Sequence, residues 1–140
     1  MCRTLMMSFV GALTLCCIVS GGKLSAADAE SIESLRKEKL KVAQEWWDVI
    51  QTRDQLGAAR PGLDMRYKAA KAVKDAELEV AADKASRINA LRTYRQRLEK
   101  LNNWAEQQSK AATIDVYELQ ELRIALIDAK IQLKVAEAKD

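Results

Sequence analysis

The chain has 140 residues, of which 23 are basic, 20 are acidic and none is histidine, and hydrophobic residues make up 49% of it. Its three cysteines, Cys2, Cys16 and Cys17, all lie near the start. Beyond them the chain lacks the usual ligands of zinc and iron–sulfur sites, the thiol nucleophile and the Ser-His-Asp triad. We therefore expect no catalytic residues, no cofactor and no metal.

The first 27 residues are typical of an export signal. Arg3 gives a short basic start, and Leu5 to Val19 is an uncharged, mostly apolar run of 15 residues. Small residues at 25–27 then offer a site for signal peptidase. We predict a signal peptide over 1–27 and a working protein over 28–140, exported to the periplasm or associated with the outer membrane.

Two other interpretations of this start remain open. A retained membrane anchor needs about 20 apolar residues to cross the bilayer, and this run is shorter. A lipoprotein signal needs a small residue before the lipidated cysteine, whereas Leu15 precedes Cys16.

Cleavage of the leader would also remove Arg3 and Lys23, leaving 21 basic against 20 acidic residues, a net charge of +1. So small a charge gives little attraction for nucleic acid, and we expect no nucleic-acid partner.

The first predicted helix covers residues 28–57. Apolar residues recur there at helical spacing, and a break that contains Pro61, the one proline of the chain, ends the helix. Trp46 and Trp47 are neighbours, so on a helix they point about 100° apart. Either one of them is an exposed anchor for a partner, or both cover the same groove from its two sides. The apolar positions are Ile32, Leu35, Ala43, Trp46 and Ile50.

The second predicted helix covers residues 63–108. The chain has no glycine or proline between Leu63 and Lys110, and one apolar stripe continues from Tyr67 to Ala105. A helix of about 45 residues would span roughly 65–70 Å. Trp104 lies near its end, where it can form a contact patch with Tyr117 or close the turn by packing.

The third predicted helix covers residues 113–138, with Thr113 as its N-cap. Its leucines and alanines alternate at steps of three and four, which is the heptad pattern of a coiled coil. A second apolar line runs along the same helix, about 140° away. Two such lines predict two neighbouring helices, in this chain or in another copy. The first line is Leu119, Leu122, Leu126, Ala129, Leu133 and Ala136, and the second is Tyr117, Ile124, Ile127 and Ile131.

Together these segments predict an all-α fold, an elongated antiparallel three-helix coiled coil built of long helical hairpins. An internal echo supports this organisation: residues 72–80 resemble residues 125–133 at a constant offset, as in two helix–turn–helix units that share the middle helix. The candidate interface residues are Trp46, Trp47, Trp104, Tyr117, Ile124, Ile127 and Ile131.

One stretch resembles a known family. Residues 112–120, with Asp115 and Val116 at a helix start, are followed by a Leu/Ala heptad that ends in an Ala- and Glu-rich stretch. This pattern is similar to the periplasmic helices of TolC-type outer-membrane efflux proteins. The resemblance implies long helices packed in a periplasmic coiled coil. It covers the helical part of the family alone, since the membrane strands have no counterpart here.

The sequence thus favours an exported, non-enzymatic helical interaction or scaffold protein of the bacterial cell envelope, with a TolC-like, efflux-associated role as the more specific expectation. The partner is a protein or a second copy, bound by helix packing, and membrane contact is expected only through the leader or an envelope complex. The alternative is a periplasmic holdase-type chaperone that binds unfolded clients. The abundant carboxylates of the chain fit a solvated helix face better than a catalytic acid–base pair.

Overall fold

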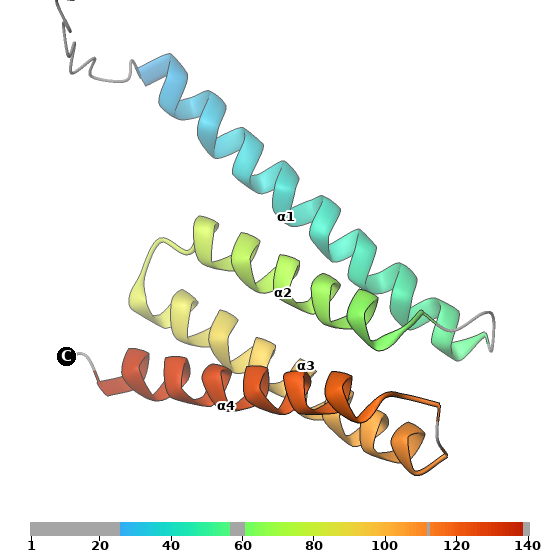
Figure 1. Cartoon of the computed structure of the whole chain (residues 1–140). Coiled ribbons are helices and arrows are strands. Elements are labelled where there is room, and N and C mark those ends of the chain that lie inside the picture. The colour runs from blue at the N-terminus through green and yellow to red at the C-terminus, as the bar shows by residue number, and fades with distance from the viewer. Residues whose placement is uncertain (1–25, 57–60, 112, 139–140) are drawn as a thin grey trace, which may run out of the picture.

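The computed structural model describes residues 26–56, 61–111 and 113–138. They form four helices, and these described ranges contain no strand, which confirms the all-α prediction. The leader predicted over 1–27 lies outside the described residues, apart from Ala26 and Ala27, which belong to the first helix. Residues 57–60 of the first predicted turn also lie outside them. The helices are α1 (Ala26–Gln55), α2 (Leu63–Val80), α3 (Lys84–Lys110) and α4 (Val116–Ala138), as Figure 1 shows.

The prediction of one long helix over residues 63–108 is wrong. The helix ends at Val80 and begins again at Lys84, so the chain has four helices where three were expected. Ala81 is extended (φ −67°, ψ 111°), and so is Asp83 (φ −135°, ψ 171°). The Asp83 carboxylate accepts the backbone N–H of Ser86 at 2.7 Å. Asp83 is therefore the N-cap of α3, and it satisfies one of the free donors of a new helix start.

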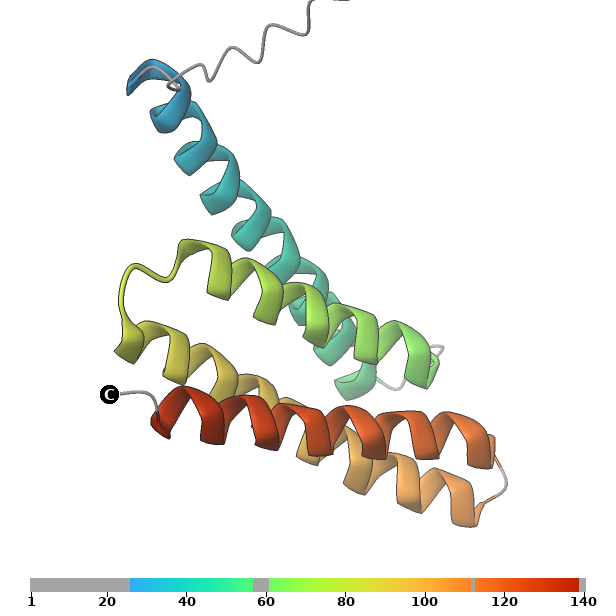
Figure 2. The ribbon, with the colours of Figure 1, turned by 60° about the vertical axis from the view of Figure 1, so that its left-hand side comes forward.

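Successive helices run antiparallel and form two hairpins, α1–α2 and α3–α4, which meet mainly through α2 and α3 (Figures 1 and 2). The helix α1 has 30 residues and α2 has 18, so they span about 45 Å and 27 Å. Lys39 of α1 is bonded to Glu79, next to the end of α2. The part of α1 before Lys39 consequently extends past α2, and Figure 2 shows it diverging from the other helices.

The core lies where α2, α3 and α4 meet. A smaller apolar cluster of Ala43, Val73 and Ala76 lies between α1 and α2. The helix α2 presents mostly small side chains to its neighbours, which lets several helices approach it closely. The leucine line predicted for the last helix is its core side, with Leu119, Leu122, Ala129 and Leu133 buried. The larger cluster consists of Leu63, Ala70, Tyr94, Leu98, Leu101, Ala105, Leu119, Leu122 and Ala129.

The apolar stripe predicted for the first helix does not form one face. Ala43 and Ile50 are buried, whereas Ile32, Leu35 and Trp46 are exposed. Two apolar lines run side by side along α1, and the predicted stripe combined residues from both of them. The line that faces α2 contains Ala43 and Ile50 with the half-buried Leu40 and Trp47.

A buried arginine joins the first turn to three helices. Arg66 of α2 is only 3% exposed, and both of its terminal nitrogens donate to the Asp54 carboxylate of α1. Its Nε donates to the Pro61 carbonyl oxygen at 2.9 Å. The guanidinium lies over the Trp104 ring of α3, 4.2 Å from the ring centroid. One side chain thus fixes the end of α1, the start of α2 and the end of α3 in one arrangement.

The second turn is closed differently from the expectation. Thr113 was predicted to cap the last helix, but its Oγ1 donates to the Gln108 carbonyl oxygen at 2.9 Å and its backbone N–H donates to the same oxygen. Thr113 therefore closes the end of α3. The side chain that caps α4 is Asp115, which accepts the Tyr117 N–H at 2.9 Å.

Candidate interaction surfaces

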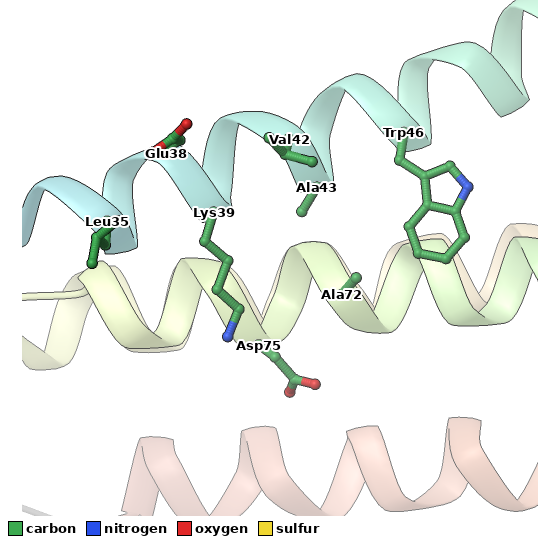
Figure 3. Close-up of a pocket in the computed structure, with 8 residues that line it drawn as sticks. All are labelled: Leu35, Glu38, Lys39, Val42, Ala43, Trp46, Ala72 and Asp75. Atoms are coloured by element: carbon green, nitrogen blue, oxygen red, sulfur yellow. The ribbon is translucent and has the colours of Figure 1, made fainter. Parts of the chain in front are cut away.

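A groove runs between α1 and α2 on the side away from the core, with a volume of about 590 Å³ (Figure 3). Leu35, Val42 and Trp46 of α1 form its apolar wall, and Ala72 of α2 lies across from them. The groove exists because α1 diverges from the smooth, small-residue surface of α2. The rest of its lining is the buried Ala43 and the charged side chains Glu38, Lys39 and Asp75.

The wall of this groove belongs to a longer apolar line on α1. Its residues recur at steps of seven, four and three, so they share one face of the helix. The members are 39% to 60% exposed, and that face lies about 100° from the face that packs on α2. We call this set the α1 line; it consists of Leu35, Val42, Trp46 and Val49. Ile32 lies five full turns from the buried Ile50, so it belongs to the side that faces α2, and it is exposed where α1 extends past α2.

A second exposed apolar line runs along α4, on the side opposite its leucines. Ile124 is 61% exposed, Ile127 57% and Ile131 54%, and Tyr117 is 80% exposed. Contiguous apolar side chains of this kind are uncommon on soluble monomers and mark sites of association. We call this set the α4 line; it consists of Tyr117, Ile124, Ile127, Ile131 and Val135.

The two adjacent tryptophans predicted as interface candidates have different surroundings in the structure. Trp47 is half buried and packs against both apolar clusters, with the Arg97 guanidinium 5.6 Å from its ring centroid. Trp46 lies in the groove and is 39% exposed. The other predicted aromatic pair is also divided: Trp104 packs against the larger cluster beneath Arg66, while Tyr117 is exposed.

Four members of these lines were not predicted from the sequence as exposed residues: Leu35, Val42, Val49 and Val135. The signal was present, because Val42, Trp46 and Val49 follow the same steps of three and four as the core residues beside them. Two parallel lines on one helix cannot be assigned to core and surface until the neighbouring helix is known.

Ion pairs flank the α4 line and fasten α4 to α3. Arg123 donates to Glu106, and Arg92 donates to Glu137, each at 3.0 Å. The donors Arg123 and Asn102 lower the pKa of Glu106, and the Ser86 N–H lowers the pKa of Asp83. These shifts favour the ionised form of each carboxyl, which suits a structural acceptor, whereas a general acid needs its pKa raised.

The described part of the chain holds no group of three or more acidic side chains placed to bind a metal ion. Over the same residues, no helix has the length and apolar character needed to cross a bilayer. Comparisons with protein-family models, with curated proteins and with solved structures found no match.

Proposed function

We propose that this chain is an exported helical interaction protein of the bacterial cell envelope, a scaffold without enzymatic activity that binds by packing its helices against those of a partner. One observation carries the proposal: α1 and α4 each bear a second apolar line in addition to the one that faces the core. A helix that needed only its place in this bundle would require one such line. The second line on each helix matches the heptad spacing with which helices recognise one another.

The partner that fits this chemistry is a helical protein or a second copy of this chain. The α4 line lies within the stretch, residues 112–136, that resembles the periplasmic helices of TolC-type efflux proteins. Long helices packed side by side, as that resemblance implies, would cover Ile124, Ile127 and Ile131. The more specific proposal is therefore a TolC-like, efflux-associated role.

The α4 line is tested by placing charge on it. In a variant with Ile124→Glu and Ile131→Glu, we expect the helicity to stay unchanged, because both side chains are exposed. We expect the mass measured by light scattering to fall below that of the wild-type chain or its complex, because packing through the α4 line is lost. Gln132→Glu, an exposed neighbour on another face, is the control and should leave the assembly intact. An identical mass for all three proteins, alone or with a co-purified partner, would refute an associating role for this line.

The export part of the proposal has its own test. The chain is produced in a bacterial host from its full sequence with a C-terminal tag, and the cells are fractionated. We expect the tagged protein in the periplasm or with the outer membrane, and an N-terminus at Asp28 by mass spectrometry. A cytoplasmic protein that begins at Met1 would exclude export by this leader.

A second candidate function, a holdase-type periplasmic chaperone, is favoured by the open groove between α1 and α2. Its apolar wall can hold extended hydrophobic segments of unfolded clients. A holdase would suppress the aggregation of a heated client protein, followed by light scattering, and Val42→Asp in the groove would abolish this while Gln44→Asp would not. A scaffold would give no protection in either form, so the two functions are distinguished.

A further inference from the structure

The link between α2 and α3 has the composition of a helix, although it forms a turn. It consists of Ala81, Ala82 and Asp83, without glycine or proline. Alanine has the highest helix propensity of all residues. Tight turns between helices usually contain residues that stop a helix, and here Asp83, as the N-cap of α3, is the residue that favours the break.

The core faces of α2 and α3 are in phase across this link. Val73 of α2 and Leu91 of α3 are both buried, and they are 18 residues apart, which is five full turns of a helix. The positions between them at steps of three and four are mostly charged, namely Glu77, Lys84 and Arg87, with Val80. If residues 81–83 became helical, the core faces of α2 and α3 would therefore lie on one side of a single straight helix. That helix would run from residue 63 to residue 110 and span about 70 Å.

The contacts that hold the two hairpins together mainly connect α2 with α3 and α4. Arg97 of α3 pairs with Glu77 of α2 at 3.4 Å, and both side chains are four-fifths buried or more. Lys74 of α2 lies over the Tyr94 ring of α3, 5.1 Å from its centroid. Each of these contacts joins one hairpin to the other, so each can be made equally well when the second hairpin belongs to another molecule.

We propose that residues 81–83 are a hinge, and that through it a second copy of this chain exchanges hairpins with the first. In the exchanged dimer α2 and α3 of each copy merge into one long helix, and the α1–α2 hairpin of one copy packs on the α3–α4 hairpin of the other. The partner is a second copy because this chain itself carries both halves of the hairpin interface. Monomer and dimer differ chiefly at the hinge, so the helix propensity of the hinge and the protein concentration set their balance. This inference goes beyond the proposed function and does not use the α1 and α4 lines.

Hinge variants move the balance in opposite directions. Ala82→Pro is compatible with the conformation of Ala81, which is already extended as the residue before a proline must be, and it prevents a continuous helix. Light scattering should then show a monomer at every concentration. Asp83→Ala removes the N-cap, which lowers the equilibrium constant for forming the turn about fivefold in each copy. The dimer has two copies, so its association constant should rise about 25-fold. Asp115→Ala, which removes the equivalent cap from α4 away from the hinge, is the matched control and should leave the association constant unchanged.

A charge-exchange experiment tests the hairpin interface itself and does not depend on the stability of any hinge variant. One chain carries Glu77→Arg and the other Arg97→Glu, each with its own affinity tag. Alone, each chain places two like charges at this largely buried contact. In a mixed exchanged dimer, position 77 of each copy meets an opposite charge at position 97 of the other. After joint refolding, we expect nearly all of the dimer to carry both tags, whereas random pairing of wild-type chains with the same two tags gives about half.

The outcomes separate the hinge from the proposed function. Enrichment of the mixed pair, together with loss of the dimer in Ala82→Pro, supports the hinge. A wild-type chain that stays monomeric up to millimolar concentration, with no enrichment of the mixed pair, overturns it. A dimer that persists in Ala82→Pro, shows no charge-exchange enrichment and disappears with Ile124→Glu and Ile131→Glu overturns the hinge and supports the α4 line.

Discussion

Removal of the carboxylate that faces Arg66 is the most demanding test of the fold. Arg66 is 3% exposed and Asp54 is 29% exposed, so the guanidinium depends on this partner while the carboxylate still reaches water. Breaking a buried ion pair by deleting one partner costs about 3–5 kcal/mol, because the other charge stays buried and unpaired. We expect Asp54→Ala to lower the free energy of unfolding by about 3 kcal/mol, the low end of that range, because water can enter from the Asp54 side.

The opposite deletion should cost less. Arg66→Met keeps an aliphatic side chain beneath Trp104 and leaves a carboxylate that solvent can hydrate, so we expect a loss of about 1–2 kcal/mol from the hydrogen bonds and the cation–π contact. The double variant should be about as stable as Arg66→Met alone. Urea unfolding followed by far-ultraviolet circular dichroism measures all four proteins. The reasoning fails if Arg66→Met costs more than Asp54→Ala, or if the two losses simply add.

Three further perturbations have outcomes that the structure fixes. Leu98→Ala opens a cavity at a fully buried position and should cost about 2–5 kcal/mol in urea unfolding, whereas Ile127→Ala on the exposed α4 line should change stability by less than about 0.5 kcal/mol; equal losses would contradict the assignment of core and surface. Burial raises the pKa of the Tyr94 phenol above its ordinary value, so its contribution to stability is complete below about pH 10 and is lost as the pH rises toward the folded value; Tyr94→Phe should flatten this alkaline loss, and an unchanged slope would argue against it. Hydrogen bonds from Arg123 and Asn102 lower the pKa of Glu106, so its contribution is complete above the ordinary carboxyl pKa of about 4.3 and is lost as the pH falls through the folded value. Thermal midpoints between pH 2 and 6, compared with those of Glu106→Gln, measure this acid loss, which the variant should reduce.

The sequence predicted the helical class and the core side of α4, because these depend on local periodicity. Leu119, Leu122, Ala129 and Leu133 are buried at the steps of three and four on which the prediction rested. The internal echo falls on corresponding helices, since residues 72–80 lie in the second helix of one hairpin and residues 125–133 in the second helix of the other. The prediction that the two units share the middle helix is wrong, because that helix is divided into α2 and α3.

Two features could not be predicted from local pattern. The turn at residues 81–83 lacks glycine and proline, and its local signal is Asp83 three residues before Ser86, whose N–H it accepts. An aspartate in a charged stretch is too common to indicate a helix start by itself. The division of α1 into a core face and an exposed face depends on where α2 lies, which is tertiary information. Ala43 and Trp46 are equally good core candidates until the small residues of α2 select one of them.

The central position of α2 explains why the candidate surfaces lie on the outer helices. Ala69, Ala70, Val73 and Ala76 are fully buried, so α2 offers its neighbours a smooth surface with little volume of its own. Neighbouring helices can fill such a surface with one line of side chains each, and the leucines of α4 and the Ala43 side of α1 do so. The apolar side chains of Val42, Ile124 and Ile131 take no part in that packing. Their contact with water has a free-energy cost for the folded monomer. Covering the α1 and α4 lines with another helix would remove that cost, which is the physical basis of the proposal that this protein acts by helix association.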